Sequence, residues 1–423
     1  MGLGSRVVAV FARRYLAGSR NSSFALSKLS YLPRKTLMPL RRNGLDPVPE
    51  LGLRRRTQPV SPLKVPIGLN TWLVTGYEET KAVLGRSEGF SNDFNHLVGN
   101  GGVTADQNPG GLGFSDPPVH TRLRRLLTPE FTRRRLARLA PRIDAIITEQ
   151  LDAMEAAPQP VDLWQSFALP IPSLTICELL GIPYADRADF QRLSAARFDL
   201  VQPADASLNA ISESLAYLRT VIVEKRKAPD DGLLGMLIKQ HGDEIDDEEL
   251  TGLADGLLTG GFETTASMLA LGALVLLQNP DAAERLRHDD DAGVRFVEEV
   301  LRYLTVVQVA FPRIATQDTE IGGVKIARGD VVLCSLSGAN RDDALGPGME
   351  SFDASRTPTS HLAFGYGIHR CVGAELARME LGAAYPALVR RFPAMRLAIS
   401  PDKVAFRKTS IVYGLESLPV VLH

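Results

Sequence analysis

One stretch of the chain, LADGLLTGGFETTASMLALGALVLL at 253–277, is apolar on nearly every side. A helix that is hydrophobic all round has to be buried, so this stretch predicts about seven turns of helix inside a core. The acids at 246–249 suit its start, because negative side chains stabilise the positive end of a helix dipole. Other elements of the chain must therefore surround this helix.

Small and polar residues interrupt this apolar helix at one place. Gly260 and Gly261 each cost roughly 1 kcal/mol against alanine in a helix interior, and they leave room for a large group against the backbone. Glu263 and Thr264 follow, and an acid beside a hydroxyl can relay protons from solvent to a buried centre. Ordinary helix packing around a satisfied polar pair explains the same residues equally well.

The remaining sequence has mostly helical patterns and a few short strands. Residues 72–85 read as a strand, a glycine turn and a helix, and helical patterns dominate from 121 to 305. Short strand-like pieces separated by glycine turns lie between 311 and 336. We therefore expect a mainly α fold with small β-sheets (α+β), in one large domain that comprises residues 46–423.

Composition and charge exclude several classes of function. The net charge of −1 gives no global field that would attract nucleic acid. The cysteines Cys177, Cys334 and Cys371 are far apart, so a reducing, cytoplasmic setting fits better than a disulfide framework. No run of about 18 apolar residues predicts a membrane span. The chain has no Walker loop and no dinucleotide fingerprint, so any electrons must come from elsewhere.

Residues 1–45 differ from the rest in charge. They contain nine Lys and Arg residues, and the first acid of the chain is Asp46. Three interpretations remain open: a loose basic extension, a segment that contacts a membrane surface or a partner, and an organellar transit peptide.

A tightly turned segment, HLAFGYGIHRCVG at 361–373, carries Cys371 between glycines. The helical pattern that begins at Val372 places its sulfur at a helix N-terminus, where free amides favour a thiolate. Such a thiolate is either a nucleophile, with His369 as the nearby base, or a metal ligand. The glycines indicate a flat ligand pressed against the backbone, and the alternative is a structural cysteine in a turn.

A third segment, FVEEVLRYL at 296–304, places Glu299 and Arg302 three residues apart on one helix face. Taken alone, this spacing is more typical of a solvated surface pair, which contributes a few tenths of a kcal/mol.

Together the three segments resemble the cytochrome P450 family, the haem-thiolate monooxygenases of the soluble bacterial type. Phe364, Gly367, Cys371 and Gly373 match its haem loop, F-x-x-G-x-x-x-C-x-G. Residues 299–302 match its E-x-x-R pair, and residues 260–265 match its oxygen-binding helix. The order and spacing match as well, from about residue 46 to the C-terminus. The loop is a specific signal, whereas the other two motifs are weak alone.

The resemblance implies roles for individual residues. Cys371 is expected to be the axial metal ligand of a haem b iron, a ligand that favours O–O cleavage, and Glu263 and Thr264 are expected to deliver protons during O2 activation. Further haem contacts are implied for Phe364, Gly365, Gly260 and Gly261, and a structural charge network for Glu299, Arg302 and Arg356.

The haem propionates need cations. In HTRLRR, His120 and Arg124 lie four residues apart on one helix face and match the family's propionate pair, and Arg313 and His369 hold the other matching positions. The neighbouring arginines at 122, 125 and 133–135 are expected to be a solvated face that doubles as a docking patch for an acidic redox partner.

The resemblance also outlines a pocket for a hydrophobic small-molecule substrate. The lid would be the glycine-rich loop 95–113 and the roof the stretch 198–209. The wall residues would be Val306, Val307, Val309, Ile411 and Val412. Core packing explains each of these positions at least as well.

The sequence therefore predicts an enzyme that inserts one oxygen atom of O2 into a hydrophobic substrate. Two electrons would come from a separate ferredoxin or flavodoxin with its NAD(P)H reductase. Two alternatives remain open: a P450 that catalyses oxidative coupling or desaturation, and a non-enzymatic haem-binding sensor.

Overall fold

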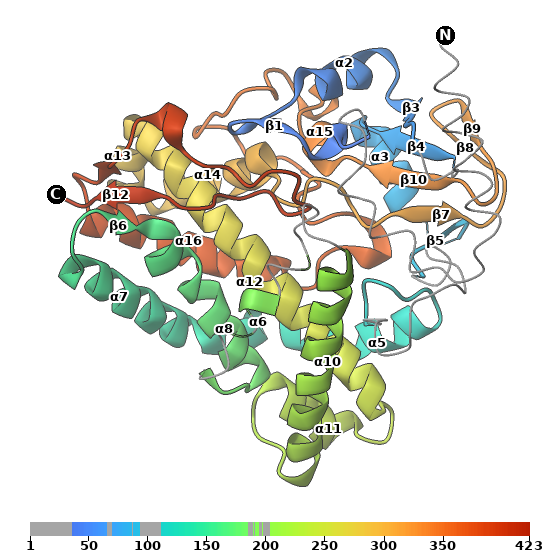
Figure 1. The fold of residues 1–423 in the computed structure, drawn as a ribbon, viewed down its shortest axis with the longest axis horizontal. Coiled ribbons are helices and arrows are strands. Elements are labelled where there is room, and N and C mark those ends of the chain that lie inside the picture. Colours follow the sequence, from blue (N-terminus) through green and yellow to red (C-terminus); the bar gives the residue numbers. More distant parts are fainter. Residues whose placement is uncertain are drawn as a thin grey trace.

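The computed structural model of the chain describes residues 36–65, 70–86, 88–93, 111–184, 189, 191–193, 197 and 204–423. Figure 1 shows the long helix α12 (Asp247–Gln278), in yellow, running obliquely through the middle of the molecule. Green helices lie on one side of it and a small twisted sheet on the other. This is the mainly α architecture with small sheets that the sequence predicts.

Helices form most of the described structure. The longer ones besides α12 are α7 (Ala140–Ala156), α8 (Pro170–Leu180), α10 (Ala204–Lys227), α11 (Leu233–His241), α13 (Pro280–His288), α14 (Asp290–Leu304) and α16 (Ala374–Arg391). The shorter ones are α2 (Pro49–Thr57), α3 (Tyr77–Leu84), α5 (Val119–Leu127), α6 (Arg133–Leu136) and α15 (Leu336–Ala339). The π-helical turn η6 (Trp164–Ala168) precedes α8.

The strands are short and form small sheets. The largest has the order β3 (Val60–Pro62), β4 (Thr71–Val74), β10 (Val331–Cys334), β7 (Arg313–Ala315), β5 (Phe90–Ser91), and only its β4–β10 pair is parallel. A second has the order β11 (Arg396–Leu397), β12 (Pro419–Val421), β6 (Val161–Asp162). The pairs β1 (Arg42–Asn43) with β2 (Asp46–Pro47) and β8 (Thr319–Ile321) with β9 (Val324–Ile326) complete the described strands.

The predicted apolar helix is α12, and it begins six residues before the apolar stretch. The Asp246 side chain caps it by accepting a hydrogen bond from the Glu249 amide at 2.8 Å. Among the described residues, α12 is also the one helix long and apolar enough to cross a membrane, which the sequence analysis did not anticipate. Since 78% of its most apolar window is buried inside the protein, it is accounted for as the core helix.

Residues 36–45, the last part of the predicted basic extension, pack on the domain. Met38 is buried in a small core with Val48 and Leu51. Arg42 donates hydrogen bonds to the carbonyl oxygens of Leu304, at 2.7 Å, and Thr305, at 3.1 Å. The ten residues from 36 to 45 therefore pack on the domain because their apolar and cationic groups have partners there. Residues 1–35 lie outside the described residues.

Candidate active site

The loop around Cys371 is a tight turn stabilised by its own backbone. The Cys371 amide donates to the Phe364 carbonyl at 2.9 Å, and Gly365 and Gly367 have φ angles of 69° and 73°. A Cβ atom on Gly367 would lie 2.2 Å from the carbonyl oxygen of Leu84, so only glycine fits between this loop and α3. Helix α16 follows at Ala374, two residues later than expected.

The Cys371 residue is exposed, and its sulfur lies among several positive groups. Desolvation by the surrounding protein raises the pKa of the Cys371 thiol, while a hydrogen bond from the Gly373 backbone and the charges of Arg124 and Arg370 lower it. The net shift is upward. A metal cation bound to the sulfur would favour the thiolate, because a coordinating thiol is deprotonated.

Four positive or ionisable side chains gather beside this loop, as predicted from their positions. The rings of His120 and His369 lie 4.2 Å apart between centroids. Arg124 donates to the Arg370 carbonyl at 2.7 Å, next to Cys371. Arg313 is buried, and its charge acts on both histidines.

Both histidines are neutral at pH 7. Desolvation, followed by the charge of Arg313 and of His120, lowers the pKa of His369 to about 3. Desolvation, followed by the charge of Arg124, also lowers the pKa of His120. Two guanidinium groups, Arg124 and Arg313, therefore supply the positive charge of this cluster.

His120 points to a ligand, because it is 2% exposed and neither ring nitrogen has a hydrogen-bond partner. Buried polar atoms are almost always paired. An acidic group placed between His120 and the two arginines would accept a hydrogen bond from the His120 ring and balance the positive charge of Arg124 and Arg313. These residues, beside an accessible cysteine on a glycine turn, fit a haem whose propionates meet the cations and whose iron meets the sulfur.

One face of α12 is open. Gly256, Gly260 and Thr264 recur every four residues, and a Cβ on either glycine would meet nothing within 4 Å. The Thr264 hydroxyl donates to the Gly260 carbonyl at 2.9 Å. Gly261 does not share this space, which corrects the prediction for it. Its Cβ would lie 2.8 Å from a methyl carbon of Ile176 on α8, so that glycine serves helix packing.

Glu263 is buried, with 1% of its side chain exposed, and it pairs with Arg407 rather than with its neighbour Thr264. Arg407 lies 144 positions away in the sequence, after α16. No local spacing pattern connects these two residues, so Arg407 could not be predicted from the sequence.

The E-x-x-R pair is buried, not solvated. Arg302 donates to both carboxylate oxygens of Glu299, at 2.8 Å each, and the two side chains are 1% and 2% exposed. Arg356 Nε lies 3.3 Å from a Glu299 carboxylate oxygen, and the Asp353 amide donates to the Glu299 carboxylate at 2.9 Å. The remaining Arg302 donors reach carbonyl oxygens of the 340–351 segment. The predicted network therefore forms around Glu299.

A second network behind the cysteine loop was not anticipated. Glu298, next to the predicted acid, accepts hydrogen bonds from Arg378 Nε at 2.6 Å and from His361 at 3.1 Å. Burial raises the Glu298 pKa, but these hydrogen bonds outweigh it and lower the pKa to about 2. The Arg378 guanidinium lies 4.8 Å from the centre of the Phe364 ring. The network therefore contacts Phe364, the first residue of the loop motif.

The predicted substrate wall is brought together only in part. Val307 and Val412 form an antiparallel bridge, and the Tyr413 amide donates to the Val306 carbonyl at 2.8 Å. Val306 and Val412 are buried in the main apolar core, whereas Val307, Val309 and Ile411 are half-buried. The expected lid and roof, except for residues 111–113 and 204–209, lie outside the described residues.

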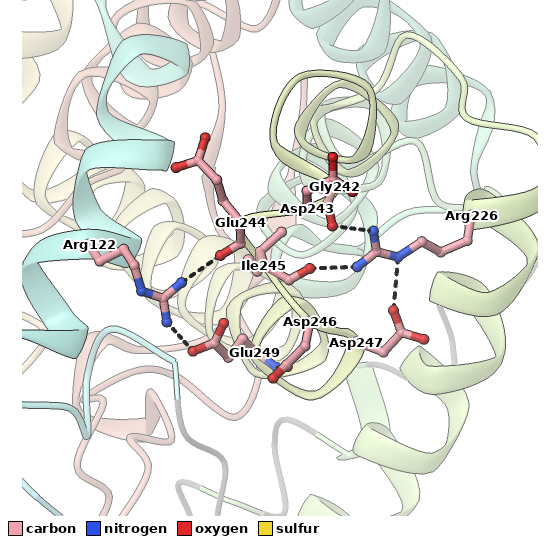
Figure 2. Close-up of a pocket in the computed structure, with 9 residues that line it drawn as sticks. All are labelled: Arg122, Arg226, Gly242, Asp243, Glu244, Ile245, Asp246, Asp247 and Glu249. Atoms are coloured by element: carbon pink, nitrogen blue, oxygen red, sulfur yellow. Dashed lines mark hydrogen bonds and ion pairs between the residues drawn. The ribbon is translucent and has the colours of Figure 1, made fainter.

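Two arginines of the basic stretch after His120 have acids beside them. Figure 2 shows residues 242–249, which form the turn before α12 and the first residues of that helix, between Arg122 of α5 and Arg226 of α10. Arg122 pairs with Glu249, and Arg125 lies 3.3 Å from Glu244. The turn borders a surface recess of about 580 Å³. Arg125 is 71% exposed and is therefore part of the expected solvated face, whereas Arg122 is half-buried against Glu249.

Comparison with known proteins identifies the family. The family model for cytochrome P450 matches residues 219–403. Cytochrome P450-SU2 of Streptomyces griseolus is 41% identical over 380 residues, which cover 89% of this chain and 93% of that protein. The chain belongs to the cytochrome P450 family. Another P450 relative, the mycinamicin IV hydroxylase/epoxidase of Micromonospora griseorubida, is 37% identical over 90% of this chain and 96% of its own length.

Solved structures agree with this assignment. The mycinamicin VIII methyl hydroxylase of Micromonospora griseorubida superimposes with a TM-score of 0.85 at 35% identity, and the match covers 90% of this chain and 98% of that chain. OxyB from Actinoplanes teichomyceticus superimposes with a TM-score of 0.76 at 42% identity, over 91% of this chain and 99% of that one. As a cytochrome P450 monooxygenase, the chain is an oxidoreductase that works with haem, O2, a substrate and a source of electrons.

Proposed function

We propose that this P450 inserts one oxygen atom of O2 into an apolar, medium-sized molecule, with haem b held by Cys371. The observation that carries the proposal is the cluster beside the cysteine loop, where His120 is buried with two unpaired nitrogens among arginines. When bound, the haem supplies O2 activation, and a thiolate ligand favours O–O cleavage.

The chain's own residues bind the cofactor. Arg124, Arg313, His120 and His369 hold the propionates, with charge from the arginines and hydrogen bonds from the imidazoles. Gly365, where a Cβ would meet nothing within 4 Å, would let the porphyrin approach the loop backbone, while Gly367 lets the loop pack on α3. Glu299 and Arg302 fix the segment behind the haem, because their bidentate pair is fully buried.

Other residues handle protons and substrate. Gly256 and Gly260 leave the α12 face free of side chains, and Thr264 holds a hydroxyl there whose lone pairs accept and pass protons. Glu263 takes protons to this position. Val307, Val309 and Ile411 form part of an apolar wall. Electrons reach the site singly from a separate ferredoxin or flavodoxin with its NAD(P)H reductase, because the sequence contains no nucleotide fingerprint. The protein works in the cytoplasm.

The first test is the carbon monoxide difference spectrum of the dithionite-reduced protein. A Soret band shifted far to the red is expected for the wild type, and Cys371→Ser should abolish it. Cys334→Ser is the matched control, because Cys334 is a buried thiol on β10. A red-shifted band that survives in Cys371→Ser would exclude this cysteine as the ligand.

A second test follows the oxygen atoms. Product formed under isotopically labelled O2 should carry one labelled atom. A product without label would instead support oxidative coupling or desaturation.

A further inference from the structure

The partner of Glu263 suggests how proton delivery is organised. Arg407 Nη1 donates to Glu263 Oε1, and the arginine side chain is 17% exposed while that of the acid is 1% exposed. The pair thus lies at the boundary between solvent and protein, with Arg407 on the solvent side and Glu263 on the interior side. A proton that reaches Glu263 from this side passes Arg407 first.

Arg407 is held in place independently of Glu263. Its amide donates to the Gly414 carbonyl at 2.9 Å, and Phe406 forms a bridge with Leu415, so the arginine stands in a hairpin. This hairpin packs on α12, since a Cβ on Gly414 would lie 2.7 Å from the Ser267 hydroxyl. Its guanidinium lies 4.5 Å from the centre of the Trp164 ring, in η6. A planar guanidinium stacked on an aromatic ring has a fixed direction. Arg407 is therefore pre-oriented toward the acid.

Glu263 needs such a partner. A carboxylate removed from water has to be paired, since an uncompensated buried charge is strongly unfavourable. Its neighbour Thr264 does not hydrogen-bond to it, because the hydroxyl donates to the Gly260 carbonyl. The contact with Arg407 therefore determines where the Glu263 carboxylate lies relative to the open face of α12.

We propose that Arg407 is a positioning residue for proton delivery. It acts through Glu263, whose carboxylate it holds beside the open face of α12 at the point where solvent protons arrive. The inference rests on the proposed function, because the proton path leads to the haem site. It adds a residue from the C-terminal hairpin to the chemistry of α12.

The test uses the holoprotein and needs no knowledge of the natural substrate. Guaiacol is the reporter, and hydrogen peroxide or iodosylbenzene is the oxidant. With peroxide, the O–O bond breaks, both oxygen atoms become water, and two guaiacol molecules each lose an electron and a proton. This cleavage needs a proton moved from one peroxide oxygen to the other, whereas iodosylbenzene transfers its oxygen without that step.

Arg407→Gln should lower the peroxide-driven rate about tenfold and leave the iodosylbenzene-driven rate unchanged. The variant loses only the orientation of the acid, so the effect on the rate is smaller than the ~10²–10⁴-fold rate enhancement that general acid–base catalysis supplies. Glu263→Gln should show the same selectivity, and Arg407→Lys should restore part of the rate. Lys408→Gln is the matched control, because it removes the same charge from an exposed neighbour in the hairpin.

A second readout does not depend on activity. Urea unfolding midpoints of Glu263→Gln, Arg407→Gln and the double variant measure the energetic coupling of the pair. The double variant should lose less stability than the sum of the losses in the two single variants. Additive losses, or equal effects on both oxidants, would overturn the inference while the carbon monoxide spectrum stays intact. A wild type without that spectrum would instead overturn the proposed function.

Discussion

Glu299→Gln isolates the effect of burial on an ion pair. The substitution keeps the shape of the side chain but removes its charge, and it turns one acceptor oxygen into a donor that faces the Arg302 guanidinium. Arg302 is 1% exposed and would remain as an uncompensated buried charge. The Asp353 amide would lose a charged acceptor at the same time.

Breaking a buried pair by removing one partner costs about 3–5 kcal/mol. A domain of this size has an unfolding entropy of about 0.8 kcal/mol per kelvin, so a loss of about 4 kcal/mol lowers Tm by about 5 °C. The measurement is thermal unfolding of the purified protein, followed by circular dichroism and by haem absorbance. The two probes should coincide if the domain unfolds in one step.

Glu248→Gln provides the matched control. Arg219 also donates two hydrogen bonds to Glu248, at 2.9 Å each, but the acid is 70% exposed. An exposed pair contributes about 0–1 kcal/mol, so the control should change Tm by about 1 °C or less. Equal shifts for the two variants would refute the reasoning, because both acids accept two hydrogen bonds from one arginine, whereas only Glu299 is buried and also accepts from Asp353 and Arg356.

Three further predictions concern other parts of the chain. Because the pKa of Glu298 is lowered to about 2 in the folded protein, its contribution to stability is present above its ordinary pKa of 4.5 and is lost as pH falls toward 2. In urea unfolding at several pH values, Glu298→Gln should therefore lose less stability than the wild type as pH falls from 4.5 to 2. Gly367→Ala should destabilise more than Gly365→Ala, because both have positive φ but only the first would clash, and equal urea midpoints would contradict this. A chain that starts at Asp46 should melt below one that starts at Thr36, since it lacks the packed residues 36–45; the same Tm would mean that this segment contributes nothing.

Sequence patterns predicted the features that depend on neighbours along the chain. The apolar stretch at 253–277 gave α12, because a helix without a polar face has to be central. The turn around Cys371 was predictable, since its glycines mark positive φ. The pairs His120 with Arg124 and Glu299 with Arg302 were predictable because residues three or four apart share a helix face.

Contacts between distant segments could not be predicted in this way. Arg407 meets Glu263 across 144 positions, and Arg378 meets Glu298 across 80. The burial of Glu299 was also hidden, since the same spacing occurs on solvated helices. Gly261 shows a related limit, because spacing cannot tell a glycine that faces a ligand from one that faces another helix, here α8.

The acidic turn before α12 has a consequence for how charged molecules approach this face. A single charge is felt over about 8 Å in physiological salt, but alternating charges cancel at shorter range. Arg122 and Arg125 have Glu249 and Glu244 beside them, but Asp243, Asp246 and Asp247 also line the recess, so from a distance this face is negative. A cationic molecule that docks there should therefore associate faster at low ionic strength, whereas an acidic molecule is repelled from this face until salt screens its charge.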